Sequence, residues 1–315
     1  MKRKLSRNIL ANRYANKTDG VLRYYDMRAR GNRIWAIVIL LICILMIAVV
    51  LFPVIWVTLS GFKDVKEFTR STQILPSSIS FEEYVKTWNQ LKFSRYYFNS
   101  FVLIVGAMTC AVLFNGLLAY VLAIMKPRGH KIIFSLVMAT MLIPPTTSIV
   151  AQYVNINNAL GWLSGIFQVD NYQKTILPMI PLWLIYGANA FWLILFKQFF
   201  EGLPKEYFEA ARIDGCSDLG IFWRIVLPLS TSILVVVAIF AATTAWSDFL
   251  LPNLVLGNGP WKTVMARLFD FKSTINVRPT DIVRAVVFSI VPPMVLFAFF
   301  QKQITKGVSG GGIKG

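Results

Sequence analysis

The chain has 315 residues, of which 56% are hydrophobic and only 15% are charged. A soluble domain usually carries about 25% charged residues, so the composition argues against a water-soluble protein and indicates that lipid is the solvent. The formal net charge of +17 raises nucleic-acid binding as an alternative. Much of that excess lies in residues 2–33, and no aromatic and basic nucleic-acid-binding pattern accompanies it.

The N-terminal segment is predicted to be a basic cytoplasmic arm, residues 1–33. Its basic residues outnumber two acids, Asp19 and Asp26, as expected of a segment retained inside the cell. The basic residues are Lys2, Arg3, Lys4, Arg7, Arg13, Lys17, Arg23, Arg28, Arg30 and Arg33. The first apolar run follows this long arm and is long enough to span a bilayer, so we expect a permanent helix rather than a cleaved signal peptide.

Predominantly apolar runs of about 20 residues, the length that crosses a bilayer as a helix, occur six times. They cover residues 34 to about 59, 100–124, 132–150, 176–196, 233 to about 251, and 283–300. Backbone polar groups must be satisfied internally in lipid, so these runs are helices. The sequence predicts an all-α integral membrane protein of the cytoplasmic membrane with six transmembrane helices.

Basic loops set the predicted orientation. Lys126, Arg128, His130 and Lys131 join the second and third helices, and Lys302, Lys306 and Lys314 follow the sixth. The positive-inside rule then puts both termini in the cytoplasm, with residues 61–97, 155–174 and 253–281 outside. Proline pairs are expected to kink helices three, four and six, either for packing or as flex points. They are Pro144 and Pro145, Pro178 and Pro181, and Pro292 and Pro293.

Catalytic chemistry is not apparent in the chain. The three cysteines, Cys43, Cys110 and Cys216, have no metal-ligand spacing, and His130 is the one histidine. No phosphate-binding glycine loop occurs, so we expect no bound cofactor and a separate subunit that binds ATP. The helix interiors essentially lack the carboxylates of a proton relay, and Asp248 near one helix end is the nearest exception.

The loop from Leu203 to Pro228 carries the signals of two short helices around a turn. Pro204 suits the first position of a helix, and Gly215 suits the left-handed residue that follows a helix. Ser217 or Asp218 can cap the next helix, and Pro228 can end it. On the first helix, bulky and small side chains share one region and form a knob that fits a groove. They are Tyr207, Phe208, Ala211 and Arg212.

The same loop contains a motif with fixed spacing. Glu-Ala-Ala is followed by Gly after three intervening residues, by Ile after nine more, and by Leu-Pro after one more. These are Glu209, Ala210, Ala211, Gly215, Ile225, Leu227 and Pro228. The pattern resembles the cytoplasmic coupling motif of permease subunits of binding-protein-dependent ABC importers. The resemblance implies a type I ABC importer permease fold over residues 34–303, in which the coupling loop is 198–230. The alternative is an ordinary surface hairpin with a buried alanine face.

The resemblance also implies a mechanism, in which the first short helix inserts into a cleft of an ATPase subunit. Arg212 and Asp214, which lie between the motif residues Ala211 and Gly215, belong to this contact. The partners it implies are two ATPase subunits, a second similar permease and an extracellular solute-binding protein. Residues 53–56 and 60–63, Asn99-Ser100 and the glycine-rich cytoplasmic tail (304–315) resemble the maltose-type carbohydrate permeases. By itself, such a tail is usually disordered.

Polar side chains within the predicted helices are candidates to line a sugar pathway, because hydroxyls bond amides and aromatic faces stack on pyranose rings. They are Asn115, Asn189, Thr243, Thr244, Trp246, Ser247 and Asp248. Hydrogen bonding between helices is the alternative role. In the external loop, a turn cluster is the candidate contact for the solute-binding protein. Its residues are Gly257, Asn258, Gly259, Pro260 and Trp261.

The sequence therefore predicts the permease subunit of an ATP-driven importer for a mono- or oligosaccharide, with no catalytic site of its own. An importer permease for another solute remains open. A passive channel or a membrane-embedded enzyme would leave the coupling motif unexplained.

Overall fold

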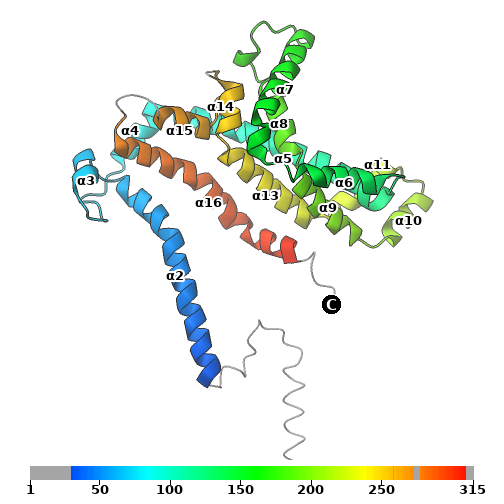
Figure 1. The fold of residues 1–315 in the computed structure, drawn as a ribbon, viewed down its shortest axis with the longest axis horizontal. Coiled ribbons are helices and arrows are strands. Elements are labelled where there is room, and N and C mark those ends of the chain that lie inside the picture. Colours follow the sequence, from blue (N-terminus) through cyan, green and yellow to red (C-terminus); the bar gives the residue numbers. More distant parts are fainter. Residues whose placement is uncertain (1–29, 258, 273–276, 310–315) are drawn as a thin grey trace, which may run out of the picture. The chain divides into compact units, whose positions relative to one another are not determined.

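The computed structural model describes residues 30–257, 259–272 and 277–309, and their regular structure is entirely helical (Figure 1). The chain forms two compact units, residues 1–59 and 60–315. The predicted arm before residue 30 and the tail after residue 309 lie outside the described residues. The first described helix is α2 (Arg30–Ser60). The α-helices that follow it, all in the second unit, are α3 (Val65–Arg70), α4 (Glu82–Leu91), α5 (Phe93–Tyr120), α6 (His130–Thr140), α7 (Pro145–Ile166), α8 (Met179–Gly187), α9 (Ala190–Glu201), α10 (Glu206–Ile213), α11 (Asp218–Ile221), α12 (Leu227–Leu229), α13 (Thr231–Ser247), α14 (Leu250–Leu256), α15 (Val264–Lys272) and α16 (Pro279–Ser309). Short π-helices η2 (Val121–Met125) and η4 (Phe222–Val226) and a 3-10 turn η3 (Tyr172–Lys174) complete them.

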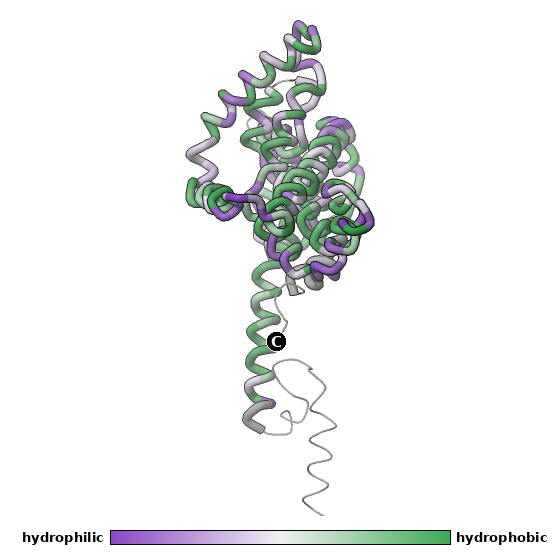
Figure 2. Tube along the Cα trace, turned by 90° about the vertical axis from the view of Figure 1, so that its right-hand side faces the viewer, coloured by the Kyte–Doolittle hydropathy of each residue, from purple (hydrophilic) through white to green (hydrophobic). Residues whose placement is uncertain are grey.

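The helix α2 forms the described part of the first unit. Its segment Arg33–Ser60 is apolar enough to cross a membrane, and none of its most hydrophobic window is buried inside the chain. Figure 2 shows this hydrophobic character along most of the helix. The first predicted transmembrane run is therefore a single helix, and Pro53 lies inside it.

Two further helices are long and apolar enough to cross a membrane, Phe93–Met125 and Pro279–Lys302. Three bent helix pairs also qualify when each is taken as one span: α6 with α7, α8 with α9, and Asp218–Leu229 with α13. By length and composition the described chain thus has three spanning helices, or up to six. Each predicted apolar run overlaps one of these six elements.

The third run departs from the prediction of one kinked helix over 132–150. The chain breaks after Thr140, α7 begins at Pro145, and the two helices differ in direction by 104°. A proline pushes the preceding residue out of helical geometry, while it fits the first position of a new helix. The new helix then continues to Ile166, through much of the segment predicted as an external loop.

The fourth run bends by 49°, but not at its prolines. Pro178 precedes α8 and Pro181 lies in its first turn, where a missing N–H is tolerated. The break falls instead at Ala188 and Asn189, whose side-chain oxygen accepts a hydrogen bond from the Phe191 N–H at 2.9 Å and caps α9. In the sixth run, Pro292 and Pro293 lie within the continuous helix α16.

The fifth run, predicted to reach about Leu251, ends sooner. Its helix α13 stops at Ser247, and a short break at Asp248 and Phe249 leads into α14. The loops predicted outside are also partly helical, since α3 and α4 occupy 61–97 and α15 occupies 253–281.

The centre of the second unit is α5, which packs against α8, α9 and α13. The approach to α8 is close, because a Cβ atom at Gly187 would lie only 2.5 Å from the Cβ of Cys110. Buried side chains form two clusters along α5. One includes Leu103 and Trp246, and the other includes Phe196, Phe208 and Phe222.

Candidate functional site

The loops of the second unit gather at its two ends. At one end, a groove of about 210 Å³ is lined by residues from η2, α9 and α10, including Lys126, Leu203 and Arg212. At the other, a groove of about 590 Å³ is lined by Arg95, Gln173 and Gly259 among others. Loops predicted to be cytoplasmic thus share the first end, called here the inner groove, and loops predicted to be external share the second, called the outer groove.

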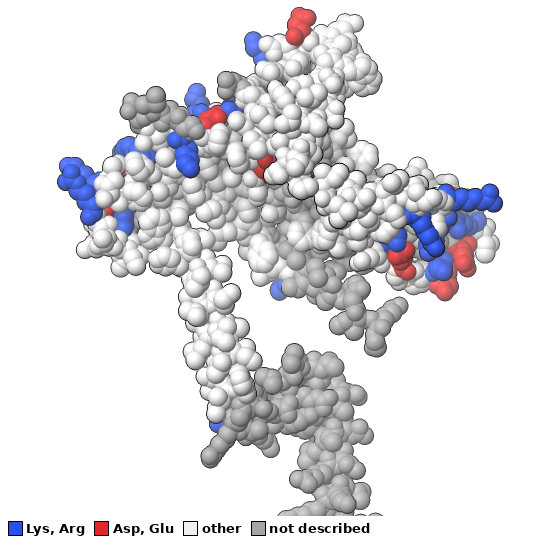
Figure 3. Space-filling view, viewed as in Figure 1, with Lys and Arg blue, Asp and Glu red and all other residues white. Residues whose placement is uncertain are grey.

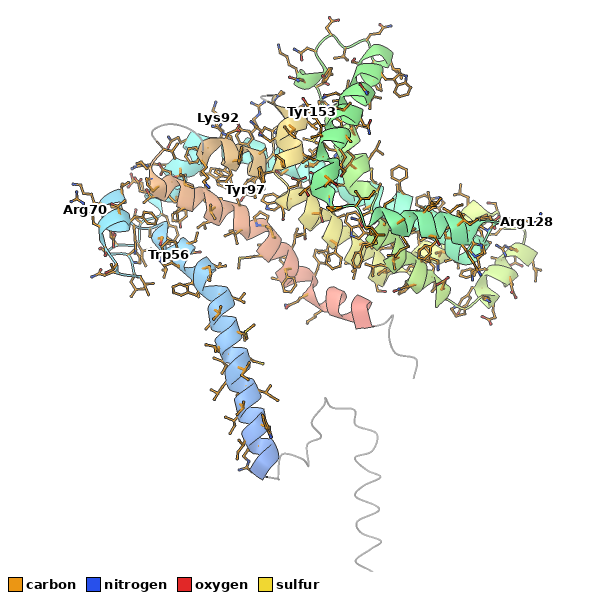
Figure 4. All side chains as sticks on the ribbon, viewed as in Figure 1. Trp56, Arg70, Lys92, Tyr97, Arg128 and Tyr153 are labelled. Carbon is orange, nitrogen blue, oxygen red and sulfur yellow. The ribbon has the colours of Figure 1, made fainter. Side chains whose placement is uncertain are left out.

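Positive side chains mark both ends. Figure 4 shows Arg70 and Arg128 at opposite ends of the second unit. Figure 3 shows Lys and Arg side chains gathered over α3 and, far from it, over the region of α10. The helix α5 with η2 connects the two ends, since Arg95 lies near its start and Lys126 directly follows it.

The segment 203–229 forms the predicted hairpin. The helix α10 ends in a turn in which Gly215 has φ of +78°, and the Cys216 N–H donates to the Ala211 carbonyl at 2.9 Å. Left-handed backbone of this kind favours glycine. Ser217 then caps α11, because its hydroxyl oxygen accepts a hydrogen bond from the Gly220 N–H at 3.2 Å.

Two boundary details of this hairpin differ from the prediction. Pro204 does not occupy the first helical position, because α10 begins two residues later at Glu206. Pro228 lies inside α12, and the helical run ends one residue after it, at Leu229. The chain then turns by 85° into α13.

The two faces of α10 differ. Phe208 and Ala211 are buried in the cluster that also holds Phe222. On the opposite face Tyr207 and Glu209 are exposed. The predicted knob is therefore split between the chain's own core and the solvent-facing surface.

The remaining motif residues divide in the same way. Ala210, Asp214, Gly215 and Pro228 are exposed, whereas Leu227 is buried and Ile225 half-buried. Exposed Arg212 pairs with the Asp218 carboxylate at 3.3 Å, which holds the two arms of the hairpin together. The exposed members are accessible to a partner, whereas Leu227 and Ile225 pack in or against the helix core.

Asn115 and Asn189, two of the pathway candidates, meet at the break between α8 and α9. The Asn115 side-chain amide donates to the carbonyls of Ala111, at 2.8 Å, and Gly187. Its oxygen accepts from the Asn189 N–H at 3.3 Å. The Asn115 side chain thus satisfies backbone groups freed by the broken helix, which favours the interhelical hydrogen-bonding role for it. The Asn189 side chain is exposed and makes only the local cap of α9.

On α13, Thr243, Thr244 and Ser247 are exposed in the isolated chain. The two threonine hydroxyls donate to carbonyls four residues earlier, at 2.8 and 2.9 Å. Trp246 is instead buried, with its indole N–H donating to the Ser289 carbonyl at 3.0 Å. That placement gives Trp246 a packing role, and its ring lies edge-on to Tyr97 at 5.5 Å.

Asp248 has two partners at the end of α13. The Tyr186 hydroxyl donates to one carboxylate oxygen at 2.8 Å, and the Leu250 N–H donates to the other at 2.9 Å. The carboxylate thereby links α8 to the start of α14.

The outer turn cluster is fixed to the start of α5. The Asn99 side-chain amide donates to the carbonyls of Pro260 and Lys262, both at 2.9 Å, and the Ser100 hydroxyl oxygen accepts from the Val264 N–H at 2.9 Å. Gly259 is confined, because an added Cβ would lie 2.7 Å from the Gln173 carbonyl oxygen. Of the other candidates, Gly257 ends α14 and Trp261 is half-buried, while Asn258 lies outside the described residues.

A buried ionic cluster near the start of α16 was not predicted from the sequence. The Arg284 side chain is 1% exposed and donates to the Asp281 carboxylate at 2.8 Å and to the carbonyls of Gly61, at 2.7 Å, and Lys63, at 3.3 Å. Asp281 also accepts a hydrogen bond from Thr87 of α4 at 3.1 Å. One signal was present, an arginine at the edge of an apolar run, since such residues are rare in membranes unless paired.

Comparison with known proteins shows the family of the chain. A family model described as "Binding-protein-dependent transport system inner membrane component" matches residues 30–310. The chain belongs to this family. As an inner membrane component it is a multi-pass protein of the cytoplasmic membrane and a transport subunit rather than an enzyme, and its ATPase and binding protein are separate chains.

Individual relatives of this inner membrane component are permeases. It is 31% identical over 268 residues to the probable ABC transporter permease protein YurM of Bacillus subtilis, covering 84% of each chain. It is 29% identical over 269 residues to the arabinooligosaccharides transport system permease protein AraQ of the same organism, covering 84% of this chain and 91% of the relative. The diacetylchitobiose uptake system permease protein NgcG of Streptomyces coelicolor is 29% identical over 287 residues, with 90% of each covered.

A solved chain shares the fold. It comes from a bacterial ABC transporter involved in the import of the acidic polysaccharide alginate, and matches with a TM-score of 0.72 over 87% of this chain and 98% of that one. At 22% identity the match concerns the fold alone. It confirms the predicted all-α permease fold for this inner membrane component.

Proposed function

We propose that this chain is the permease subunit of an ATP-driven importer for mono- or oligosaccharides, with six spans and both termini in the cytoplasm. The observation that carries the proposal is the hairpin of α10 and α11, whose buried face joins the helix core and whose exposed face carries Glu209 and Ala210. The printed names of AraQ and NgcG, which refer to arabinooligosaccharides and diacetylchitobiose, support a saccharide as solute.

The proposed topology rests on the two groups of loops. If each bent pair crosses once, the elements from α5 to α13 run alternately between the outer and inner grooves in chain order. Lys126, Arg128 and Lys131 then lie on the cytoplasmic side, as the positive-inside rule requires.

The exposed face of the hairpin is the proposed ATPase contact. Glu209 offers a carboxylate, Ala210 permits close approach, and Gly215 with Asp214 shapes the turn. Ala211, Ile225 and Leu227 act behind that face, because their burial transmits a push on the hairpin to α9, η2 and α13. ATP would bind only in the partner subunits.

A second permease is the proposed partner within the membrane. Thr243, Thr244 and Ser247 of α13 are exposed in the isolated chain, so a facing subunit would enclose them as part of a shared polar pathway. Their small hydroxyl groups suit hydrogen bonding to a neutral sugar.

The outer groove is the proposed contact for the solute-binding protein. Its lining combines Arg95 and Lys174 with Gly259 and Pro260 of the turn cluster, and Asn99 holds that cluster in place. An acidic surface on the binding protein would complement the two cations.

The decisive test is a charge reversal in the assembled transporter. Glu209→Lys should leave insertion and subunit assembly intact and strongly reduce ATP-driven sugar uptake by proteoliposomes. Glu206→Lys is the matched control, because Glu206 is exposed on the same helical turn but does not line the inner groove. Equal uptake by both variants would contradict the assignment of the coupling surface.

The same preparation distinguishes two alternative functions from the proposed one. Uptake of a different solute class in a ligand screen on the binding protein would keep the importer and replace the saccharide. Uptake without ATP would instead favour a passive channel.

A further inference from the structure

The segment that joins α3 to α4 exposes large apolar side chains. Ile74, Leu75, Ile79 and Phe81 are 50%, 68%, 69% and 67% exposed, and together they are called here the apolar patch. Several exposed apolar side chains of this size within one short segment indicate a candidate binding surface. The proposed sugar pathway and the hairpin do not involve them.

The backbone beneath the apolar patch is fixed in place. The Glu67 carboxylate accepts hydrogen bonds from both the N–H and the hydroxyl of Ser77, each at 2.8 Å. The Lys63 ammonium group donates to the Gln73 carbonyl. Since this backbone is held by charged side chains, the apolar groups are displayed on an ordered loop.

The apolar patch is also connected to the residues that follow α2. Lys63 lies three residues after the last residue of α2, a candidate membrane span, and its bond to Gln73 ties the segment to this part of the chain. The ring of Phe81 lies 5.3 Å from the ring of Phe62, two residues after the same span. The segment 71–81 is therefore tied at both ends to residues that directly follow this candidate span.

The charged side chains beside the apolar patch suit lipid headgroups. Lys66 and Arg70 of α3 are exposed, and neither forms an ion pair with a carboxylate of the described chain. Basic side chains beside apolar ones are typical of segments that lie in the membrane interface, where cations meet phosphates and apolar groups meet acyl chains.

We propose that the apolar patch inserts into the lipid interface, with Lys66 and Arg70 facing phospholipid headgroups. The segment anchors the junction between α2 and α4 to the bilayer surface. The proposal depends on the proposed topology only for the choice of the outer leaflet, and the insertion itself is independent of the transported solute.

The test uses spin labels on the full chain in its assembled transporter, in bilayer nanodiscs containing anionic lipid. After replacement of Cys43, Cys110 and Cys216 by serine, a single cysteine at Leu75 or Ile79 carries the label. Controls carry it at Thr72 or Ser78, exposed polar positions of the same segment. Patch labels should collide more with oxygen, which concentrates in lipid, and control labels more with a water-soluble nickel complex.

Two results would overturn the proposal. If the patch labels collide with the nickel complex as often as the control labels do, the loop is exposed to water. If the patch labels are protected from both oxygen and the nickel complex, a protein partner covers them instead. Neither readout measures uptake, so a failure here is distinct from a failure of the proposed transport function.

A second measurement keeps all native cysteines. Phospholipids with a photoreactive group near the glycerol are activated in the same nanodiscs, and tryptic peptides are analysed by mass spectrometry. Cleavage after Arg70 and Lys86 isolates the patch in one peptide, 71–86. We expect lipid adducts on this peptide and a marked loss in the Leu75→Ser/Ile79→Ser double variant; an unlabelled wild-type peptide would contradict the proposal.

Discussion

The hairpin at the inner groove and the segment 61–92 at the other end of the second unit are built in different ways. The hairpin is held by contacts between near neighbours in sequence, such as Ser217 with Gly220 and Arg212 with Asp218. The outer segment is held by Arg284, which bonds the Gly61 carbonyl 223 residues away. Local signals therefore describe the first region, and only the folded chain describes the second.

The difference has a physical origin. A cap or a left-handed glycine acts within a few residues, so its energy is present as soon as the helix forms. A buried charge is favourable only when its partners have already been assembled around it, because desolvation opposes burial of an unpaired charge. The outer segment should accordingly be more sensitive to loss of one side chain than the hairpin.

The largest expected effect is at the buried ionic cluster. Arg284→Met leaves Asp281 and two carbonyls without their buried donor, and loss of one member of a buried pair costs about 3 to 5 kcal/mol. Thermal unfolding in detergent measures the change. Arg278→Met is the control, because Arg278 also bonds Asp281 but its side chain is 47% exposed, and an exposed pair contributes about 0 to 1 kcal/mol. Equal destabilisation would show that burial does not distinguish the two arginines.

Next in size is the pair of alanines on α10. Ala211→Leu overfills the cluster around Phe208 and should destabilise the protein by about 1 to 3 kcal/mol. Ala210→Leu should leave the unfolding temperature unchanged, because that side chain is exposed, and should instead lower ATP-driven uptake through a clash with the ATPase. Unfolding curves and uptake assays on both variants separate packing from contact. The reverse pattern would mean that the faces of α10 are wrongly assigned.

A smaller effect is expected at the helix cap. Ser217→Ala removes the acceptor for the Gly220 N–H, and loss of such a cap costs about 1 kcal/mol. Hydrogen exchange of the α11 amides should rise in this variant while exchange in α5 stays unchanged. Increased exchange throughout the unit would indicate that the hairpin and the core unfold together.

The smallest effect concerns pH at the segment 71–81. Hydrogen bonds from Ser77 lower the pKa of the Glu67 carboxyl below its ordinary value, so this contact stabilises the loop above that value and is lost as the pH falls through the lowered pKa. A spin label at Leu75 should become more mobile in acid. Glu67→Gln should raise mobility already at neutral pH and remove the pH dependence; an unchanged acid response would assign the effect to another group.

The sequence by itself determined the solvent, the positions of the apolar runs and the form of the hairpin. Composition and run length are sums over many residues, and the hairpin signals at Gly215 and Ser217 act locally. Both kinds of signal can therefore be interpreted without knowledge of the fold. The prolines were poorer predictors of where the helices break. Pro145 starts a new helix as its chemistry requires, but the break in the fourth run depends on Asn115, which lies on another helix.

Only the tertiary structure decided which side of each element is buried. It placed Ala211 in the core and Ala210 outside, gave Trp246 a packing role, and brought Arg284 to Gly61 and Lys63. These outcomes depend on which segments become neighbours, and side chains far apart in sequence acquire their partners only when the helices pack.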